Sequence, residues 1–526
     1  MFKVMVKRGA LVLLIVLIVF SIYVFGFATS PKAYDNDAGG PSSKPVVLLL
    51  VDSLMDKPLQ QAIQEGKAPA LEFLIQKGQL HTEVISSYPT MSVTIDSTLM
   101  TGTYPDGHQV PGLVWFNKEE SRLINYGSGK GEILRLGMNQ VLQDGLFNLN
   151  QKHLSEKTPT LYEVLSESNR ASASINGLIF RGKQKHVLNV PQLARMANIL
   201  PENSTVDGPS ILSLGAMSYH NPENRMNINA WQNMGYNDKF SAKELKHLIQ
   251  QDRLPAFTLA YFSDMDHDVH KNGPMDRKGI EKLDEQIQSI LNLYDSWDDA
   301  IKSAIWIVYG DSGQSSIKDD KRKALIDLRK LLNKYHLWEI GSSLEKQDQV
   351  VLAVNERMTY IYLLDDNIPE TDVVSELKED PRINFIAWKN GQLNHVVSTE
   401  SDRELIFSPG DSYKDDYKQK WDLDGDLSVM DLKINEGNKI EYGDYPDGLA
   451  RLYGALHSHE GRFVIVDAKP GYEFVDSHTP THIGGAGHGS LHKDDSITPL
   501  IITGTDETPR YERVVDFKEW IISMTK

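Results

Sequence analysis

Short apolar runs without a polar interruption are the feature that most constrains how this chain can fold. Residues 46–51 (VVLLLV) form one such run and stop at Asp52, and residues 305–309 (IWIVY) form another. Side chains of a strand point alternately to the two faces of its sheet, so a strand that is apolar at every position is typical of a parallel sheet covered on both faces. Comparable runs at 257–262 and 499–503 predict further strands of that sheet.

Helix-like segments separate the predicted strands. They are found at 161–167, 276–298 and 516–524. Strands that alternate with helices predict an α/β fold, here a three-layer sandwich around a mainly parallel central sheet. Between about 350 and 465 the pattern changes to shorter segments of alternating polarity, such as 357–362, which predicts an inserted α+β region.

The N-terminus predicts a location outside the cytoplasm. An uncharged apolar run from Gly9 to Thr29 follows a short basic segment. A helix of about 20 apolar residues can cross a hydrocarbon core of about 30 Å, and the basic flank favours the orientation with that flank inside. We therefore expect residues 1–29 to anchor a single-pass cell-membrane protein whose folded part is extracytoplasmic. A cleaved signal segment, and hence a secreted protein, is the alternative.

The segment after this run predicts where the folded part begins. Residues 30–44 are small, polar and rich in Gly and Pro, which is typical of a linker. The domain is then expected over residues 45–526, with the α+β insertion at about 350–465 inside it.

Composition excludes several kinds of site. The chain has no cysteine, so thiolate metal sites are excluded and any metal must be bound by Asp, Glu, His or hydroxyl oxygen. The formal net charge is −17, whereas proteins that bind DNA or RNA polymers present basic surfaces. We therefore expect no nucleic-acid polymer as a partner, although bound metal ions can still attract small anions.

Acids and histidines follow the predicted strands, where ligands gather in open α/β sheets. The segment 264–270 (DMDHDVH) comes just after the run at 257–262, and its Asp266 and His270 are four residues apart. On a helix this spacing places both side chains on one face, so they can converge on one cation. Carboxylate oxygen together with imidazole suits zinc or manganese. The segment therefore predicts a metal site.

Two hydroxyl residues, Thr90 and Ser92, lie where a helix is expected to begin. A hydroxyl at a helix start lies at the positive end of the helix dipole, which favours an oxyanion. An ordinary helix cap is the other interpretation of the same residues.

Five short blocks occur in order along the chain. They are Leu50-Val51-Asp52, Pro89-Thr90-Met91-Ser92 with Thr101 to His108 behind it, Asp266 with His270 to Pro274, Asp311, and Gly487-His488-Gly489. In this order they resemble the metal-site blocks of the alkaline phosphatase superfamily, in particular its type I phosphodiesterase and nucleotide pyrophosphatase branch. The resemblance implies a metal-dependent hydrolase of phosphate mono- or diesters that acts on a small phosphorylated substrate.

The resemblance also implies a cofactor and a set of ligands. The cofactor would be two divalent metal ions, usually zinc, with manganese as the alternative. One ion lowers the pKa of a hydroxyl nucleophile, and the other polarises the phosphate oxygens. The implied ligands are Asp266, His270 and His488 for one ion, and Asp52, Asp311 and Ser92 for the other.

The nucleophile implied by the resemblance is Ser92, because the family's hydroxyl follows the proline, here Pro89, by three residues. Thr90 is the alternative. Two other functions stay open at this stage. One is a transferase that moves phospho-groups between lipids or envelope polymers, and the other is a surface binding protein that has lost the chemistry.

Two departures from the family pattern bear on these functions. The chain has Ser312 after Asp311 where the family usually has histidine, so the second ion loses an imidazole. The phosphodiesterase branch also has an asparagine at the position of Ile95, where it is expected to bind phosphate. The residues that could replace the missing imidazole are Ser312 itself, His267, Gln314 and His492.

Overall fold

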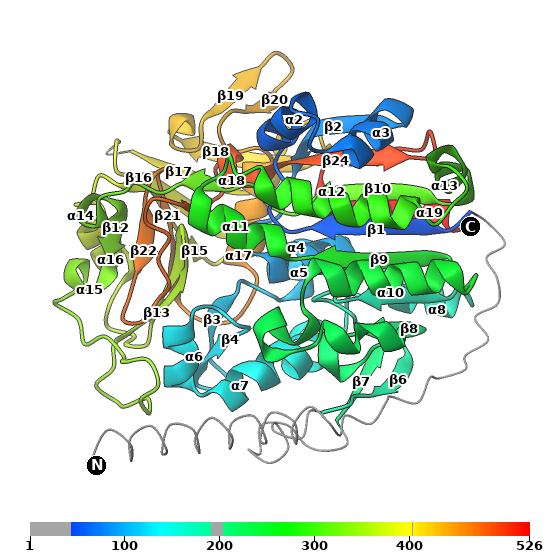
Figure 1. The fold of residues 1–526 in the computed structure, drawn as a ribbon. Coiled ribbons are helices and arrows are strands. Elements are labelled where there is room, and N and C mark those ends of the chain that lie inside the picture. Colours follow the sequence, from blue (N-terminus) through cyan, green and yellow to red (C-terminus); the bar gives the residue numbers. More distant parts are fainter. Residues whose placement is uncertain (1–43, 191–203, 402) are drawn as a thin grey trace, which may run out of the picture.

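A central sheet organises the fold (Figure 1). The computed structural model describes residues 44–190, 204–401 and 403–526. The sheet has seven strands in the order β2-β24-β10-β1-β9-β5-β8, and every strand except β24 runs in the same direction. Its strands are β1 (Val46–Val51), β2 (Gln79–Ile85), β5 (Ser172–Ile175), β8 (Ile211–Ser213), β9 (Phe257–Phe262), β10 (Ile305–Gly310) and β24 (Ile497–Thr503).

Both faces of this sheet are buried, as the apolar runs predict. Every residue of β1 is buried, and neighbours such as Val47 and Leu48 pack into different core clusters on opposite faces. Burying one such side chain contributes about 1.5–3 kcal/mol relative to leaving it exposed. The runs therefore fix these strands in the middle of the fold.

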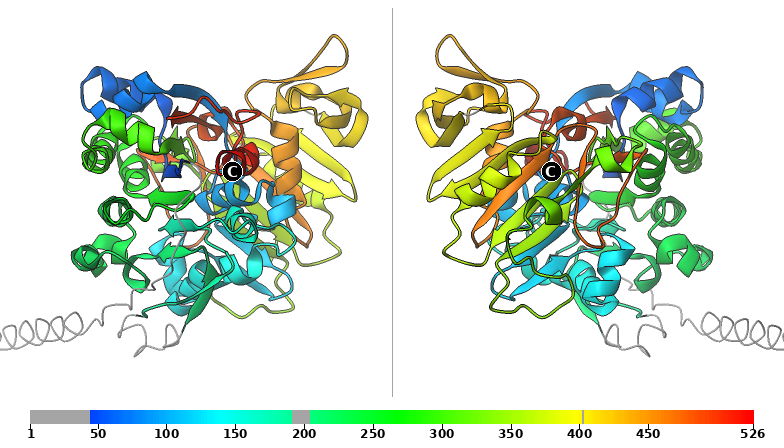
Figure 2. Two further views of the ribbon diagram at one scale, coloured as in Figure 1. Left: turned by 90° about the vertical axis from the view of Figure 1, so that its right-hand side faces the viewer. Right: turned by 90° about the vertical axis from the view of Figure 1, so that its left-hand side faces the viewer.

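Helices cover both faces and form the outer layers of the sandwich (Figure 2). One face is covered by α2 (Asp56–Gln64), α3 (Pro69–Lys77), α10 (Asp238–Gln250), α11 (Asp264–Asn272), α12 (Lys278–Leu291) and α13 (Trp297–Ser303). The other face is covered by α4 (Ser92–Thr101), α8 (Leu161–Glu167) and α19 (Phe517–Met524). The predicted three-layer α/β sandwich around a mainly parallel sheet is confirmed.

A second sheet of nine strands lies beside the first and is almost wholly antiparallel. Helices α16 (Glu370–Leu377) and α17 (Gly448–Leu456) accompany it. The domain boundaries predicted for this region stay a prediction. The strands are β13 (Val350–Asn355), β14 (Met358–Leu363), β15 (Ile383–Asn390), β16 (Leu393–Ser398), β17 (Glu404–Lys414), β18 (Lys420–Gly425), β19 (Leu432–Asn435), β20 (Lys439–Tyr442) and β21 (Phe463–Ala468).

Two predicted elements differ from the structure in detail. The run at 499–503 lies in β24, which is antiparallel to both of its neighbours. A strand with two covered faces has the same composition in either direction, so the sequence could not reveal this. The helical pattern at 276–298 is divided between α12 and the start of α13.

The predicted single-pass membrane location is corrected here. Within residues 44–190, 204–401 and 403–526, no helix is long and apolar enough to cross a bilayer. The longest helix in this part of the chain, α12, has 14 residues, whereas a membrane-spanning helix needs about 20. The predicted anchor at 1–29 and most of the predicted linker at 30–44 lie outside the described residues.

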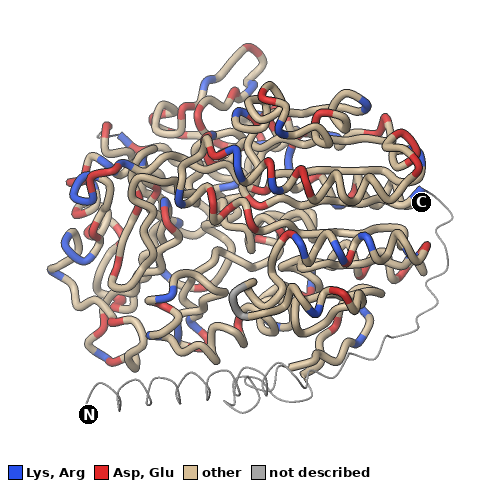
Figure 3. Tube along the Cα trace, in the orientation of Figure 1, with Lys and Arg blue, Asp and Glu red and all other residues tan. Residues whose placement is uncertain are grey.

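Charged residues of both signs are interspersed along the described chain (Figure 3). The formal net charge of the whole sequence is −17. An anionic substrate therefore gains no general attraction from the protein's net charge and has to be bound by local charges.

Candidate active site

Three carboxylates meet at the carboxyl ends of adjacent strands. Asp52 follows β1 directly, Asp311 follows β10 directly, and Asp266 lies in the first turn of α11 behind β9. Ser53 links two of them, because its N–H donates to Asp311 Oδ1 (2.9 Å) and its hydroxyl donates to Asp266 Oδ1 (2.9 Å). The strand order β10-β1-β9 thus places acids from distant parts of the sequence side by side.

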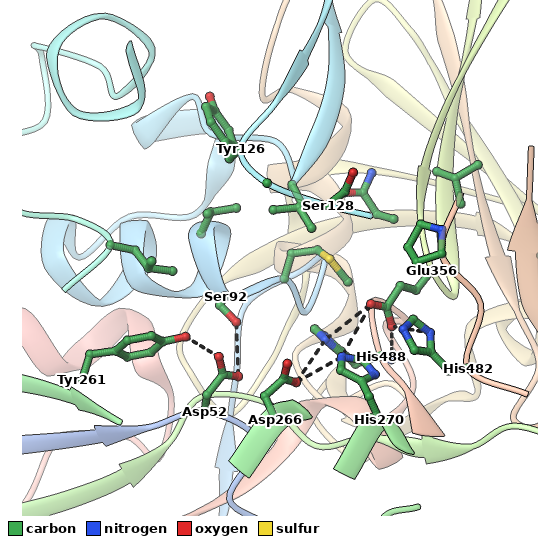
Figure 4. A pocket seen from close by; sticks show the side chains of 18 residues that line it. Asp52, Ser92, Tyr126, Ser128, Tyr261, Asp266, His270, Glu356, His482 and His488 are labelled. Atoms are coloured by element: carbon green, nitrogen blue, oxygen red, sulfur yellow. Dashed lines mark hydrogen bonds and ion pairs between the residues drawn. The ribbon is translucent and has the colours of Figure 1, made fainter. Parts of the chain in front are cut away.

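The two hydroxyl candidates have different surroundings. Ser92 is the first residue of α4, is partly exposed, and its Oγ lies 3.4 Å from Asp52 Oδ1 (Figure 4). Thr90 is buried, where its Oγ1 accepts a hydrogen bond from the N–H of Gly489 (2.7 Å) and donates to the carbonyl of Ser490. Thr90 therefore holds the loop that carries His488, whereas Ser92 faces the pocket.

Two imidazoles complete the predicted triad. His270 Nε2 lies 3.1 Å from Asp266 Oδ1, and His488 Nε2 lies 3.9 Å from the same oxygen. The Nδ1 atoms of these histidines hydrogen-bond to the carbonyls of Ala486 and Thr90. A metal-binding histidine typically donates its other ring N–H in this way, which fixes the tautomer and aims Nε2 at the ion. The structure thus brings the three residues together.

The pKa of Asp266, beside the histidines, is shifted in the opposite direction from the pKa values of Asp52 and Asp311. Burial alone would raise the pKa of Asp266, but the imidazoles of His270 and His488 outweigh it and hold that pKa below its usual value. Burial raises the pKa of Asp52 well above its usual range, and the neighbouring Asp311 raises it further. Burial likewise raises the pKa of Asp311.

Two further residues at the site were missed by the sequence analysis. Glu356 Oε1 lies 3.7 Å from His270 Nε2, and its Oε2 accepts a hydrogen bond from the N–H of His488 (3.0 Å). The ring of His482 stacks on that of His270, and its Nδ1 lies 3.0 Å from Glu473 Oε2. Glu356, His270 and His482 form a second group whose ligand atoms lie within 4.8 Å of one another.

Of these two residues, His482 could have been found from the sequence. His482 lies six positions before His488 in the segment HIGGAGHG, where glycines bring the backbone close to the site. Glu356 lies in the two-residue turn between β13 and β14, inside the insertion, and no motif surrounds it. Its place at the site follows from the docking of the second sheet.

The side chains fit divalent ions in two positions. The ligand atoms of Asp266, His270 and His488 lie within 4.8 Å of one another, and carboxylate with imidazole suits zinc. On the other side, Asp311 Oδ2 is buried and has no hydrogen-bond partner among the described residues. Because a buried carboxylate oxygen is costly without a partner, a cation bound there would compensate it.

The candidates for the missing imidazole are placed differently. Ser312 is buried beside Asp311, and Gln314 donates from its amide to Ser53 Oγ and to Asp266 Oδ1, both at 2.7 Å. His267 is exposed on α11. His492 lies at the start of the short helix α18 (Lys493–Ser496), outside the residues that line the pocket. Neither histidine lines the pocket.

A pocket of about 350 Å³ opens above these side chains. Asp52, Ser92 and His488 lie on its polar side, and none of the described residues that line it is a lysine or an arginine. Its remaining wall is largely apolar and includes Met91, Val93, Leu113, Leu178, Val354 and Pro480.

Carboxylates, imidazoles and a helix-start hydroxyl at the strand ends of this sheet define a hydrolase of the alkaline phosphatase superfamily. The chain belongs to the type I phosphodiesterase / nucleotide pyrophosphatase family, whose sequence model matches residues 46–490. The resemblance inferred from the five blocks is therefore confirmed, and so is the class of enzyme, a phosphoric ester hydrolase.

Solved structures share the fold at low sequence identity. Murine ectonucleotide pyrophosphatase/phosphodiesterase 5 is 12% identical with a TM-score of 0.52, over 91% of this chain and 95% of that one. Phosphonoacetate hydrolase from Sinorhizobium meliloti, in complex with phosphonoacetate, is 13% identical with a TM-score of 0.54, over 93% and 97%. An inactive variant of the murine protein is in complex with AMP. None of the curated proteins compared with this chain matches it.

Proposed function

We propose that this protein is a metal-dependent phosphodiesterase with Ser92 as its nucleophile. The observation that carries the proposal is the position of Ser92 Oγ, at the N-terminus of α4, 3.4 Å from Asp52 and facing the pocket. Asp266, His270 and His488 would hold one ion, for which zinc is the proposed metal, and Asp52 with Asp311 would hold the other. When bound, these ions supply charge that favours the alkoxide and offsets the phosphate oxygens.

Residues of the chain orient Asp52 toward Ser92 and favour negative charge at the serine oxygen. The Tyr261 hydroxyl donates to Asp52 Oδ2, which leaves Oδ1 directed at Ser92. The free N–H groups at the start of α4 add positive potential where negative charge develops. Ser92 Oγ then gives up its proton and forms a bond to phosphorus, while one ester oxygen leaves as the protonated alcohol. The intermediate is a phosphodiester of Ser92 that keeps the second ester group, and water later cleaves its bond from Oγ to phosphorus and releases the monoester.

The pocket favours a diester over a monoester. A monoester phosphate carries about two negative charges at neutral pH, whereas a diester carries one. No lysine or arginine is among the described residues that line the pocket, so only the metal ions could offset the second charge of a monoester. The apolar wall beside Ser92 suits an organic group of a small substrate. Neighbours that bind AMP and phosphonoacetate support a small phosphorylated or phosphonate ligand.

The test is to remove metal from the protein, restore it, and measure hydrolysis of bis(p-nitrophenyl) phosphate and p-nitrophenyl phosphate. We expect zinc or manganese to restore turnover with two ions per chain, and the diester to be the better substrate. Equal turnover by Ser92→Ala would contradict the assigned nucleophile. Bound metal with no turnover of either ester would instead point to a binding protein.

A further inference from the structure

We propose that Glu356 is a fourth protein ligand of the ion at Asp266, His270 and His488. The inference rests on the metal position in the proposed function and adds to it a residue from the second sheet, outside the five sequence blocks. Glu356 lines the pocket, and its side chain is only 11% exposed.

The distances around the two imidazoles carry this inference. Glu356 Oε1 lies 3.7 Å from His270 Nε2 and 3.9 Å from His488 Nε2. Asp266 Oδ1 lies 3.1 Å and 3.9 Å from the same two nitrogens. Ligand atoms about 2.1 Å from a tetrahedral zinc lie about 3.4 Å apart, and each of these four separations lies within about 0.5 Å of that value. Each imidazole nitrogen therefore faces a carboxylate oxygen on two sides (Figure 4).

The turn that carries Glu356 is built onto the loop of His488. The N–H of His488 donates to Glu356 Oε2, and the N–H of Arg357 donates to the carbonyl of His488 (both 3.0 Å). The backbone of Glu356 has a φ of +56°, a left-handed conformation that costs a non-glycine residue about 1–2 kcal/mol. Glycine or asparagine would suit this turn better, so the turn itself does not explain a glutamate.

Behind Glu356, a histidine and a second carboxylate hold it in place. His482 Nδ1 lies 3.8 Å from Glu356 Oε2 and 3.0 Å from Oε2 of the fully buried Glu473 in β22 (Glu473–Val475). The rings of His482 and His270 are stacked, with centroids 4.1 Å apart and planes at 25°. Ring lone pairs lie in the plane of each ring, so stacked rings do not converge on one ion. His482 is therefore a positioning residue.

A fourth protein ligand would change the charge balance at this ion and the affinity with which it is held. Two carboxylates and two neutral imidazoles balance its double charge, and four protein ligands are typical of sites that hold zinc tightly. A phosphate oxygen then needs either a fifth coordination position or a shift of Glu356. The ion at Asp266, His270 and His488, called the first ion below, is therefore expected to exchange slowly and to bind more tightly than it would with three protein ligands.

The experiment compares the wild type, Glu356→Gln and the control Glu404→Gln. Glu404 accepts a hydrogen bond from His395 (2.8 Å) in the second sheet, so the control alters a carboxylate–imidazole pair outside the pocket. Zinc affinity is measured by competition with a chelator, and the visible spectrum of the cobalt-substituted protein reports the coordination of the first ion. Circular dichroism of the metal-free proteins verifies folding, which glutamine should preserve because its oxygen can still accept from His488.

We expect Glu356→Gln to raise the zinc Kd of the tighter position by more than the ~10–100-fold that is typical when an outer-shell partner is lost, and to change the cobalt spectrum, with Glu404→Gln like the wild type. An unchanged zinc Kd would overturn the inference. So would a raised Kd with an unchanged cobalt spectrum, because Glu356 would then act through the histidines. These results leave the proposed function intact, whereas a wild type that binds no zinc would overturn the proposed metal position itself.

Discussion

The two sides of the candidate active site differ in their ligand atoms. The nitrogen side consists of Asp266, His270 and His488, with Glu356 beside them, and mixes imidazole with carboxylate. The oxygen side consists of Asp52, Asp311 and Ser312 and offers oxygen alone. The difference follows from one position, because serine stands where the family pattern has histidine.

A single residue can therefore make two proposed metal positions unequal. Imidazole suits zinc, whereas sites made only of oxygen suit magnesium, calcium or manganese. On the nitrogen side the histidines lower the pKa of Asp266, whereas burial and neighbouring carboxylates raise the pKa of Asp52. We therefore expect the nitrogen side to bind zinc first and the oxygen side to bind its ion more weakly.

The largest effect should come from removing the hydroxyl next to the oxygen side. Ser92→Ala is expected to lower kcat by about four to six orders of magnitude, because the bond to phosphorus can no longer form. Zinc on the nitrogen side should stay bound, which metal analysis can verify. The control is Thr90→Ala, which loses a buried hydrogen bond and should cost about 1–2 kcal/mol of stability with a far smaller loss of rate. The reverse order of the two rates would make Thr90 the nucleophile.

A second change tests the nitrogen side. His270→Gln should raise the zinc Kd there by more than the ~10–100-fold that is typical when an outer-shell partner is lost, because His270 itself faces the ion position. Chelator competition measures this, and His395→Gln in the second sheet serves as the control. Equal zinc affinity of His270→Gln and the wild type would remove the asymmetry on which the comparison depends.

A third change attempts to cancel the difference between the two sides. Ser312→His adds an imidazole next to Asp311 and should raise the zinc affinity of the oxygen side by at least about tenfold, because loss of an outer-shell partner alone typically costs about 10–100-fold and an imidazole ligand should matter no less. Two zinc ions of similar affinity would then be seen by calorimetry. No gain would indicate that the buried position of Ser312 cannot admit an imidazole.

The smallest effect is expected for a buried carboxylate that has no histidine among the groups that shift its pKa. Glu132 is buried, and burial raises its pKa to about 7, although its contact with Ser128 lowers it. The folded protein therefore binds a proton that the unfolded chain releases above pH 4.5, so the stability falls as the pH rises from about 4.5 to about 7. Glu132→Gln should remove this loss and add about 1–2 kcal/mol at pH 8, with little change at pH 4. Denaturant unfolding at both pH values is the measurement.

A pH-independent effect of Glu132→Gln would show that burial alone does not raise the pKa of a carboxylate in this protein. The raised pKa of Asp52 would then need another cause. The matched exposed control is Glu119→Gln on the loop before β4 (Arg122–Asn125), which should change neither value by more than about 0.5 kcal/mol.

Much of the central sheet could be predicted because its signals are local. The run at 257–262 coincides with β9, and the pattern at 161–167 coincides with α8. In the same way Asp266 and His270 share a helix face because four residues advance a helix by a little more than one turn. His267, one residue after Asp266, is turned by about 100° and is exposed. The role of His267 as a metal ligand stays a prediction.

Glu356 and Ser53 could not be predicted for a different reason. Ser53 joins two carboxylates only because β10, β1 and β9 are neighbours, an order that the sequence does not state. Glu356 reaches the histidines only because the second sheet docks its β13–β14 turn on the loop of His488. Such contacts join residues more than eighty positions apart in the sequence.

The layers of the fold, the acids at the strand ends and the family could be predicted from the sequence, because periodicity and ordered motifs are properties of neighbouring residues. Only the tertiary structure decided which carboxylates face imidazoles and which face one another. It also decided that Ser92 faces the pocket, whereas the Thr90 side chain is buried and hydrogen-bonded to the loop of His488. The physical reason is that charge and coordination depend on distance in space, and strand order and sheet docking set that distance.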